Sequence, residues 1–260
     1  MAGMNTLFAE TPLKEMDPSA LSQAIMHKAA AAGMDLDRVA EAIDAATYLH
    51  LGQTRANRGP FARTPYIEHP LRGGLRVLRW GVTAEHILLA ILLHDVVEDC
   101  LERLLARFVP GDHSGLDIQS KRGLAYAWIA SRFGAGTARI VDALTNPPGG
   151  AEQKTRAEKN TEYLLHVRLA VTDDAEVFIG KLIDFDDNAG GLHHNAVPGN
   201  EKMVGRLAVK YGPVADVFAM EFVRNADAIR ALVSEDGFAT ITTKMTSIKG
   251  RLVGLAAQYA

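Results

Sequence analysis

Apolar residues recur along this chain with the three- and four-residue spacing of amphipathic helices. After Asp35, for example, Leu36, Val39, Ile43 and Ala46 keep the helical period. Residues that commonly begin helices precede such segments, and glycines follow them. We therefore predict an all-α protein, a multi-helix bundle. The expected helices span residues 18–33, 36–51, 70–81, 84–100, 118–133, 136–145, 151–171 and 174–189, with two or three more after residue 200.

Two segments depart from this pattern. Residues 53–65 hold three arginines, two prolines and Gly59, which is typical of an exposed basic loop. Residues 238–243 alternate like a weak strand. Because the sequence has no repeat and no clear linker, we expect one domain in three parts. These parts are an N-terminal helix packed on the core (residues 1–35), the core itself (36–195) and a C-terminal helical extension (196–260).

Composition narrows the class of protein. Of 260 residues, 48% are hydrophobic and 23% are charged, which is typical of a globular chain and excludes a disordered or fibrous one. The net charge of −3 gives no overall attraction to nucleic acid or to an anionic membrane. The longest apolar run, residues 87–93, is far shorter than the roughly 20 residues of a membrane span. We therefore expect a partner that is neither nucleic acid nor a membrane.

The single cysteine, Cys100, cannot form an internal disulfide. The first residues also lack the basic and apolar segments of a secretory signal. Both observations favour a reducing compartment, so we expect a cytoplasmic protein.

The sharpest chemical feature lies in the most apolar predicted helix, where His94-Asp95 is followed by Glu98-Asp99. At about 100° per residue, the four side chains share one side of a continuous helix. Ionisable groups on so apolar a helix cost free energy unless they are paired or bound to a metal. The pattern indicates a charged site on a buried helix.

Further motifs stand in order on either side of this site, and they combine histidine, acid, amide and arginine side chains. They are His50-Leu-Gly-Gln-Thr-Arg55, Pro65-Tyr-Ile-Glu-His-Pro70, Arg132-Phe-Gly134, Val141-Asp-Ala-Leu-Thr145, and Lys181-Leu-Ile-Asp184 with Asn188 four residues later. With LLHDVVED at residues 92–99 between them, the stretch from about residue 40 to 190 resembles the hydrolase domain of the RelA/SpoT alarmone enzymes, within the HD phosphohydrolase superfamily. The resemblance implies an HD-domain bundle with extra C-terminal helices.

The resemblance also implies a metal site. Carried over position by position, His69, His94, Asp95 and Asp184 match the four metal ligands. The family suggests Mn²⁺, while iron and zinc suit the same imidazole and carboxylate ligands.

Glu98 and Asp99 match the paired acids that orient a water molecule and move its proton. The alternative interpretation of this pair is a solvated helix end that forms salt bridges with nearby arginines.

Four more residues match positions near the substrate. Arg55 would stack on a guanine base, a role that suits a planar guanidinium, and Asn188 would bond the ribose or a phosphate. Lys181 either offsets phosphate charge or is a helix lysine that extends to the surface. Tyr66 packs either beside the nucleotide or in the core.

The remaining histidines are interpreted as background. We expect His50 to support the site or to pack in its helix. His166 is expected to face solvent.

The chain also departs from the family pattern. Ile183, Phe185 and Asp187 stand where the family has alanine, arginine and histidine, and the acids at 184, 186 and 187 lower the local positive charge. The segment between Ala56 and Thr64 is longer than is usual. Residues after about 200 lie outside the resemblance and either cap the domain or form the surface of a homodimer.

The leading hypothesis is a Mn²⁺-dependent guanosine-3′,5′-bis(diphosphate) 3′-pyrophosphohydrolase, which converts (p)ppGpp to GDP or GTP and pyrophosphate. One alternative is an HD-family phosphohydrolase or phosphatase that acts on another nucleotide. The other is a non-catalytic, metal-bound nucleotide sensor.

Overall fold

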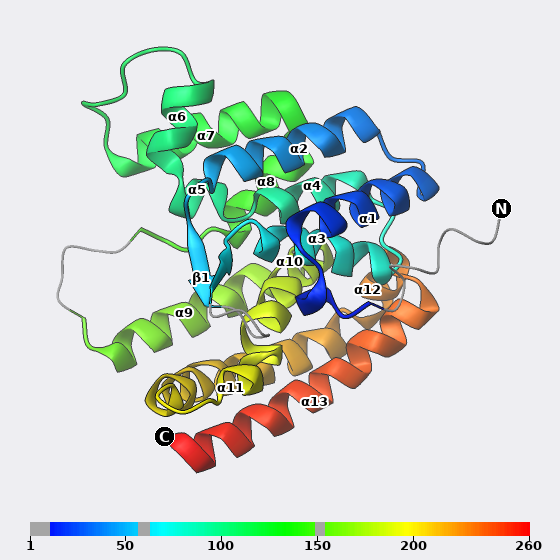
Figure 1. The fold of residues 1–260 in the computed structure, drawn as a ribbon, viewed down its shortest axis with the longest axis vertical. Coiled ribbons are helices and arrows are strands. Elements are labelled where there is room, and N and C mark those ends of the chain that lie inside the picture. Colours follow the sequence, from blue (N-terminus) through cyan, green and yellow to red (C-terminus); the bar gives the residue numbers. More distant parts are fainter. Residues whose placement is uncertain (1–10, 57–62, 149–153) are drawn as a thin grey trace. The chain divides into compact units, whose positions relative to one another are not determined.

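The computed structural model describes residues 11–56, 63–148 and 154–260 (Figure 1). Helices make up most of this part of the chain, which confirms the predicted all-α class. The described strands form one short antiparallel pair, β1 (Thr54–Ala56) and β2 (Arg63–Pro65), with Arg55 opposite Thr64. The pair occupies the two ends of the predicted basic loop, whose middle lies outside the described residues.

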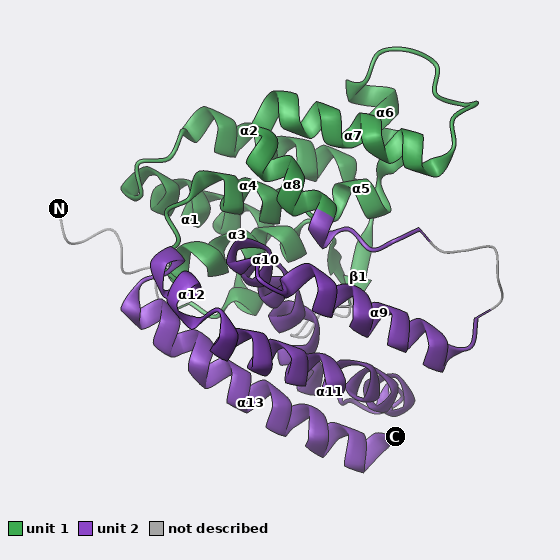
Figure 2. Ribbon diagram, turned by 180° about the vertical axis from the view of Figure 1, so that it is seen from behind, with its two compact units in different colours: residues 1–142 green, residues 143–260 purple. Residues whose placement is uncertain are grey.

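The chain forms two compact units, residues 1–142 and 143–260 (Figure 2). Neither boundary expected from the sequence, after residue 35 or after residue 195, coincides with this division. The first unit contains the two strands and the helices up to α8, which crosses the boundary between the units. Its further elements are η1 (Leu13–Glu15), α1 (Pro18–Ala31), α2 (Leu36–Leu49), α3 (Glu68–Arg79), α4 (Glu85–Leu93), α5 (Val96–Asp99), α6 (Leu101–Phe108), α7 (Ile118–Phe133) and α8 (Ala135–Leu144), whose last two residues belong to the second unit.

Helix boundaries in the first unit follow local signals. The carboxylates of Asp17, Asp35 and Asp117 accept hydrogen bonds from backbone N–H groups in the first turns of α1, α2 and α7. Helix α7 ends before Gly134, which has φ = 94°, a conformation that glycine adopts without strain. These helices therefore match the predicted spans closely.

Helix α4 lies at the centre of the first unit, and every residue from Ile87 to Leu93 is buried. It packs closely against α3, because a Cβ added at Gly74 would lie 3.0 Å from the Leu92 side chain and 3.3 Å from Ile25 of α1. Helices α1, α3 and α4 therefore pack closely together, and His94, which follows α4, is buried.

The expected continuous helix over residues 84–100 is interrupted. Helix α4 ends at Leu93, and α5 begins only at Val96. The His94 ring hydrogen-bonds the carbonyl oxygen of Ile91 at 2.8 Å. In a continuous helix that carbonyl accepts from the N–H of residue 95, so the His94 side chain competes with the helical bond.

The second unit contains α9 (Arg156–Val171), α10 (Ala175–Phe185) and the short turns η2 (Asp186–Gly190, a π-helical turn) and η3 (Leu192–Asn195). It ends with α11 (Glu201–Arg224), α12 (Ala226–Leu232) and α13 (Glu235–Tyr259). Helices α11 and α13 lie side by side (Figures 1 and 2). A Cβ added at Gly205 of α11 would lie 2.2 Å from the carbonyl oxygen of Tyr259, so only glycine fits there.

Two sequence predictions in the second unit were wrong in detail. The strand-like stretch at residues 238–243 belongs to α13, where Ile241 is fully buried. The threonines that suggested a strand donate to helix carbonyls four residues earlier, as Thr242 does to Phe238. Helix α10 begins after Asp174 instead of Asp173, because the Asp174 carboxylate accepts the N–H of Val177.

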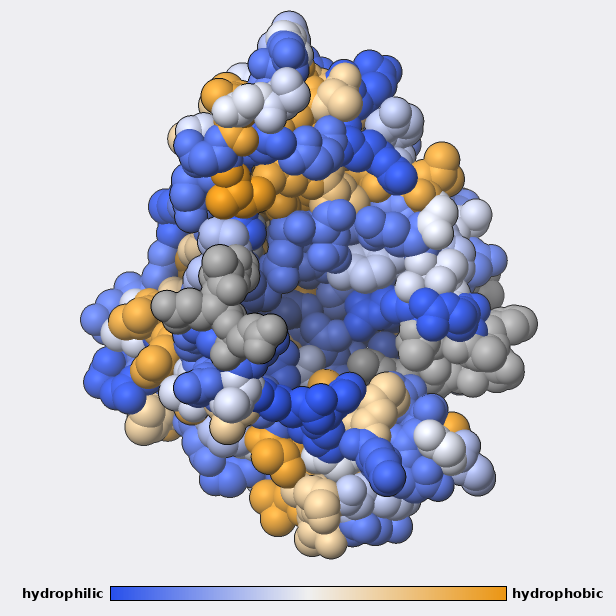
Figure 3. Space-filling view, turned by 90° about the vertical axis from the view of Figure 1, so that its left-hand side faces the viewer, coloured by the Kyte–Doolittle hydropathy of each residue, from blue (hydrophilic) through white to orange (hydrophobic). Residues whose placement is uncertain are grey.

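The surface facing the viewer in Figure 3 is mostly hydrophilic, and its apolar side chains form small, separate patches. In the described ranges, no helix combines the length and the apolar character needed to cross a membrane.

Candidate metal centre and acid pair

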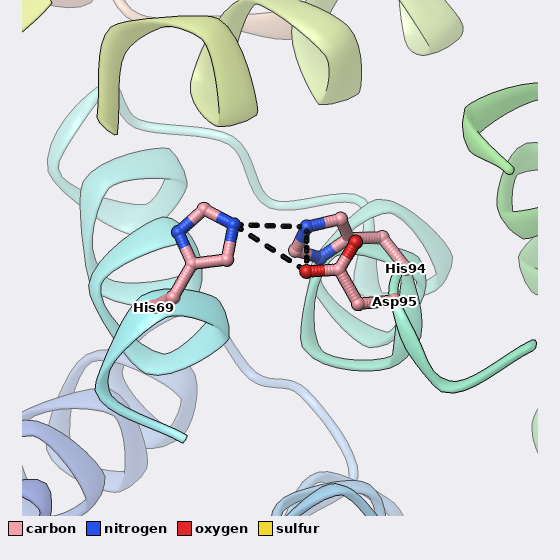
Figure 4. Close-up of side chains that lie close together, drawn as sticks. All are labelled: His69, His94 and Asp95. Carbon is pink, nitrogen blue, oxygen red and sulfur yellow. Dashed lines mark hydrogen bonds and ion pairs between the residues drawn. The ribbon is translucent and has the colours of Figure 1, made fainter. Parts of the chain in front are cut away.

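Three side chains predicted as metal ligands converge in the first unit (Figure 4). His69 comes from the first turn of α3, whereas His94 and Asp95 come from the break between α4 and α5. The Nε2 atoms of the two imidazoles lie 3.3 Å apart. Asp95 Oδ2 lies 3.0 Å from His94 Nε2 and 3.5 Å from His69 Nε2. Within the described residues, this is the one group of three or more His, Cys, Asp or Glu side chains so arranged.

The tautomer of His94 follows from its second contact. Because the carbonyl of Ile91 only accepts hydrogen bonds, Nδ1 of His94 carries a proton, and Nε2 is the ring nitrogen left to coordinate a cation. Nε2 faces the ring nitrogen of His69 and the carboxylate of Asp95. Metal-bound histidines characteristically donate their other ring N–H to a backbone carbonyl in this way.

The spacing of the three donor atoms fits a single divalent cation. For a first-row ion such as zinc, with ligands at about 2.0–2.2 Å, adjacent donor atoms lie about 3–3.5 Å apart. The three distances between Nε2, Nε2 and Oδ2 cover this interval. The donor set and its geometry therefore suit a metal, although they do not select among manganese, iron and zinc.

Burial shapes the electrostatics of the cluster. His69 and His94 are only 3% and 7% exposed. Burial acts to raise the pKa of Asp95, but the adjacent His94, His69 and the Tyr66 hydroxyl outweigh it and hold the pKa below its usual range. Asp95 is therefore an anion that offers its oxygens as ligands.

The predicted acid pair follows directly in the chain. Glu98 and Asp99 lie on α5, and both are exposed. Although Asp99 reaches the surface, its carboxyl is partly buried, and this burial, followed by the negative charge of Asp95, raises the pKa of Asp99. A cavity of about 380 Å³ lies beside the pair, and its polar lining includes Glu98, Asp99, Gln53 and Arg122.

Tyr66 and Arg55 lie next to the cluster. The Tyr66 hydroxyl donates a hydrogen bond of 2.7 Å to Asp95 Oδ2. The guanidinium carbon of Arg55, from β1, lies 5.5 Å from the centre of the Tyr66 ring. The structure thus brings five predicted site residues together: Arg55, Tyr66, His69, His94 and Asp95.

The fourth predicted ligand, Asp184, lies in the second unit near the end of α10. Its carboxylate accepts a hydrogen bond of 2.6 Å from the side-chain amide of Asn188. From residue 177 to residue 190, every residue except Asp184 and Asn188 is buried. Asp184 and Asn188, two of the three predicted site residues in this segment, are therefore the ones that it leaves partly accessible.

Lys181, by contrast, is buried within the second unit. Its ammonium donates to the carbonyl oxygen of Leu144 at 2.5 Å and to His166 Nε2 at 3.1 Å. His166, expected to face solvent, is partly buried by this contact. Burial and the Lys181 charge lower the pKa of His166 to about 4.

Asp186 and Asp187, the other two acids of the run that begins with Asp184, are also inside the second unit. Asp186 is buried, and its carboxylate forms an ion pair of 2.8 Å with Lys244 of α13. Asp187 is 1% exposed. The charge of Asp186 is thus compensated locally by a residue that lies outside the motif.

His50 supports the site, which was one of its two expected roles. Its Nδ1 lies 2.7 Å from Gln53 Oε1 and 3.4 Å from Cys100 Sγ, and its ring stacks on that of Tyr66. Gln53 had no predicted role. The one sequence signal for its contact with His50 was the spacing of three residues between them. The contact of His50 with Cys100 had no such signal, because Cys100 lies in a distant segment of the chain.

Fold and site together thus define the class: a mainly helical protein with a buried His/His/Asp cluster next to an acid pair. A curated relative, guanosine-3′,5′-bis(diphosphate) 3′-pyrophosphohydrolase of Aquifex aeolicus (strain VF5), is 27% identical over 161 residues. The match covers 62% of this chain and 19% of the relative, so the chain corresponds to about a fifth of that enzyme. No family model and no solved structure matches the chain. The similarity supports a distant relationship to a hydrolase of this kind.

Proposed function

We propose that this protein is a metal-dependent phosphohydrolase that removes pyrophosphate from the 3′ position of (p)ppGpp. The observation that carries the proposal is the convergence of His69, His94 and Asp95 on one point, with donor spacings that suit a divalent cation. The named activity of the distant relative supports the choice of substrate.

In this proposal Asp184 provides the fourth ligand. Its partial exposure in an otherwise buried segment, and its hydrogen bond from Asn188, are the properties that a ligand carboxylate needs. Mn²⁺ is the proposed ion, and iron and zinc suit the same donors. A bound divalent cation lowers the pKa of a coordinated water and offsets the charge of phosphoryl oxygens.

Glu98 and Asp99 are the proposed acid–base residues. Both carboxylates are accessible on α5, one turn from Asp95. Glu98 accepts a proton from the attacking water, and Asp99 orients that water. The proton then passes to the leaving oxygen, so that the P–O bond to the ribose oxygen breaks as the new P–O bond forms.

Substrate recognition is assigned to Arg55 and Asn188. The guanidinium of Arg55 already lies over an aromatic ring, which suits stacking on a guanine base. Asn188 is accessible for a hydrogen bond to ribose or phosphate. Lys181 contributes positive charge from inside the second unit, where its ammonium contacts Leu144 and His166. Tyr66, predicted to pack either beside the nucleotide or in the core, contacts a proposed ligand directly.

The test is a product assay. The purified protein is incubated with ppGpp and Mn²⁺, and the products are identified by ³¹P NMR. GDP and pyrophosphate are expected in equal amounts. Unchanged ppGpp would contradict the proposed substrate.

A second candidate is an HD-type phosphohydrolase that acts on another nucleotide. Ile183, Phe185 and Asp187 favour it, because they replace the residue types of the alarmone enzymes next to Asp184. A panel of nucleotides with Mn²⁺ distinguishes the two, since release of orthophosphate without pyrophosphate would favour a phosphatase. If nucleotides bind but none is turned over, the protein is a metal-bound sensor.

A further inference from the structure

Tyr66 donates a hydrogen bond to Oδ2 of Asp95, which is one of the three donor atoms of the cluster. It lies between β2 and α3, one residue after the strand ends. Its hydroxyl donates to Asp95 Oδ2 at 2.7 Å, and this is the same oxygen that lies 3.0 Å from His94 Nε2. A carboxylate oxygen has two lone pairs, so it accepts this bond and still offers an electron pair to a cation. The hydroxyl therefore fixes the direction of the remaining pair.

The ring of Tyr66 is itself held in place. It stacks on the His50 ring, with centroids 4.6 Å apart and planes at 22°. It also packs nearly perpendicular to the His69 ring, and the centroids of these two rings lie 5.9 Å apart. The Arg55 guanidinium lies 5.5 Å from its centre. Contacts of this kind restrict both side-chain torsions of the tyrosine, so the hydroxyl stays at Asp95.

His50 is in turn fixed by two side chains. The amide oxygen of Gln53 accepts a hydrogen bond from His50 Nδ1 at 2.7 Å, and Cys100 Sγ lies 3.4 Å from the same nitrogen. Cys100 also contacts the carbonyl of Leu49 at 3.2 Å, which joins the group to the end of α2. His50 is 3% exposed, so the stack under Tyr66 is part of the packed interior.

We infer that Tyr66 is a positioning residue for Asp95, and that His50, Gln53 and Cys100 hold Tyr66 in the required orientation. This inference rests on the metal site of the proposed function. It reassigns Tyr66 from direct contact with the nucleotide to the layer behind the metal ligands, because its hydroxyl donates to a ligand oxygen and also lies within hydrogen-bond reach of the Asp99 carboxylate. Removing such a hydrogen bond from a ligand commonly weakens metal binding by about 10–100-fold.

The variant that tests the inference is Tyr66→Phe in the full chain. It keeps the aromatic ring that stacks on His50 and removes only the hydroxyl. Mn²⁺ binding is measured by calorimetry on protein freed of metal, and the spectrum of bound Mn²⁺ is recorded by electron paramagnetic resonance. The dissociation constant is expected to rise by about 10–100-fold, and the spectrum is expected to change.

Tyr48→Phe is the matched control. Tyr48 is 44% exposed on α2, and its ring contacts Phe108 and Arg107, not the cluster. Its dissociation constant and spectrum should equal those of the wild type. Circular dichroism of all three proteins without metal confirms that each is folded.

Three results separate this inference from the proposed function. If the wild type binds no divalent cation, the proposed metal site is wrong. If the wild type binds Mn²⁺ and Tyr66→Phe binds it equally well with the same spectrum, the inference is overturned and the proposed function stands.

Kinetics with substrate give a further test. A positioning role for Tyr66 predicts that Tyr66→Phe lowers kcat at a fixed Mn²⁺ concentration. A rise in KM alone, with Mn²⁺ binding unchanged, would overturn the inference and return Tyr66 to the nucleotide.

Discussion

The imidazole of His94 is fixed by the carbonyl oxygen of Ile91, which accepts a hydrogen bond from Nδ1 at 2.8 Å. This contact links two properties of the site. It accompanies the break between α4 and α5, and it leaves Nε2 facing His69 and Asp95. The position of His94 at the end of the most apolar helix therefore determines both the local backbone and the direction of the donor atom.

Replacing His94 with alanine should abolish Mn²⁺ binding, because it removes one of three converging donors. A ligand present at 100 times its dissociation constant stabilises the folded state by about 2.7 kcal/mol. Thermal unfolding with and without Mn²⁺ should show this gain in the wild type and none in His94→Ala. His27→Ala, at an exposed position on α1, serves as the control and should keep the gain. Equal stabilisation of His94→Ala would contradict a metal site at this cluster.

Glu98→Gln should separate metal binding from turnover. The side chain is exposed and is not part of the three-residue cluster, so Mn²⁺ affinity should be retained. Loss of an acid–base group should lower kcat by about 10²–10⁴-fold. Glu235→Gln is the matched control, because Glu235 is exposed on α13 and pairs with Arg230. Comparable rates for Glu98→Gln and Glu235→Gln would exclude Glu98 from the chemistry.

His166 should make the protein less stable in mild acid. Burial and the charge of Lys181 lower its pKa to about 4 from the ordinary value of 6.5. The unfolded chain therefore binds a proton near pH 6.5, whereas the folded protein does so only near pH 4. Its contribution to stability is complete above about pH 6.5 and falls as the pH drops toward 4.

The measurement is urea unfolding between pH 7 and pH 4. His166→Gln keeps an acceptor for Lys181 and removes the titration, so its stability should fall less over this interval than that of the wild type. His27→Gln changes an exposed histidine and should follow the wild type. Parallel curves for the wild type and His166→Gln would show that His166 titrates normally.

Gly190→Ala should destabilise the turn that follows Asp184. A Cβ at residue 190 would lie 2.4 Å from Oδ1 of Asp186, the buried acid that pairs with Lys244. Overpacking of this kind costs about 1–3 kcal/mol. At Gly254 of α13 no atom lies within 4 Å of an added Cβ, so Gly254→Ala should instead stabilise by about 0.5–1 kcal/mol. Urea unfolding of the two variants should therefore shift in opposite directions, and a neutral Gly190→Ala would mean that the turn relaxes.

Much of the fold could be read from local signals in the chain. The span of α7 follows from Asp117 before it and Gly134 after it, which act within a few residues. The motif residues His69, His94 and Asp95 were also identifiable, because their types and order match a known pattern. The break after Leu93 was not, since it depends on a side-chain bond that competes with the helix.

The sequence by itself determined the helical class and the side chains available for chemistry, because helical periodicity, caps and residue types act over short distances. Only the tertiary structure decided which of those groups meet. It placed the hydroxyl of Tyr66 on Asp95, the ring of His50 under Tyr66 and the ammonium of Lys244 on Asp186. These partners lie 29, 16 and 58 residues apart in the chain (95 − 66, 66 − 50 and 244 − 186). Contacts over such separations depend on how helices pack, and no local pattern encodes them.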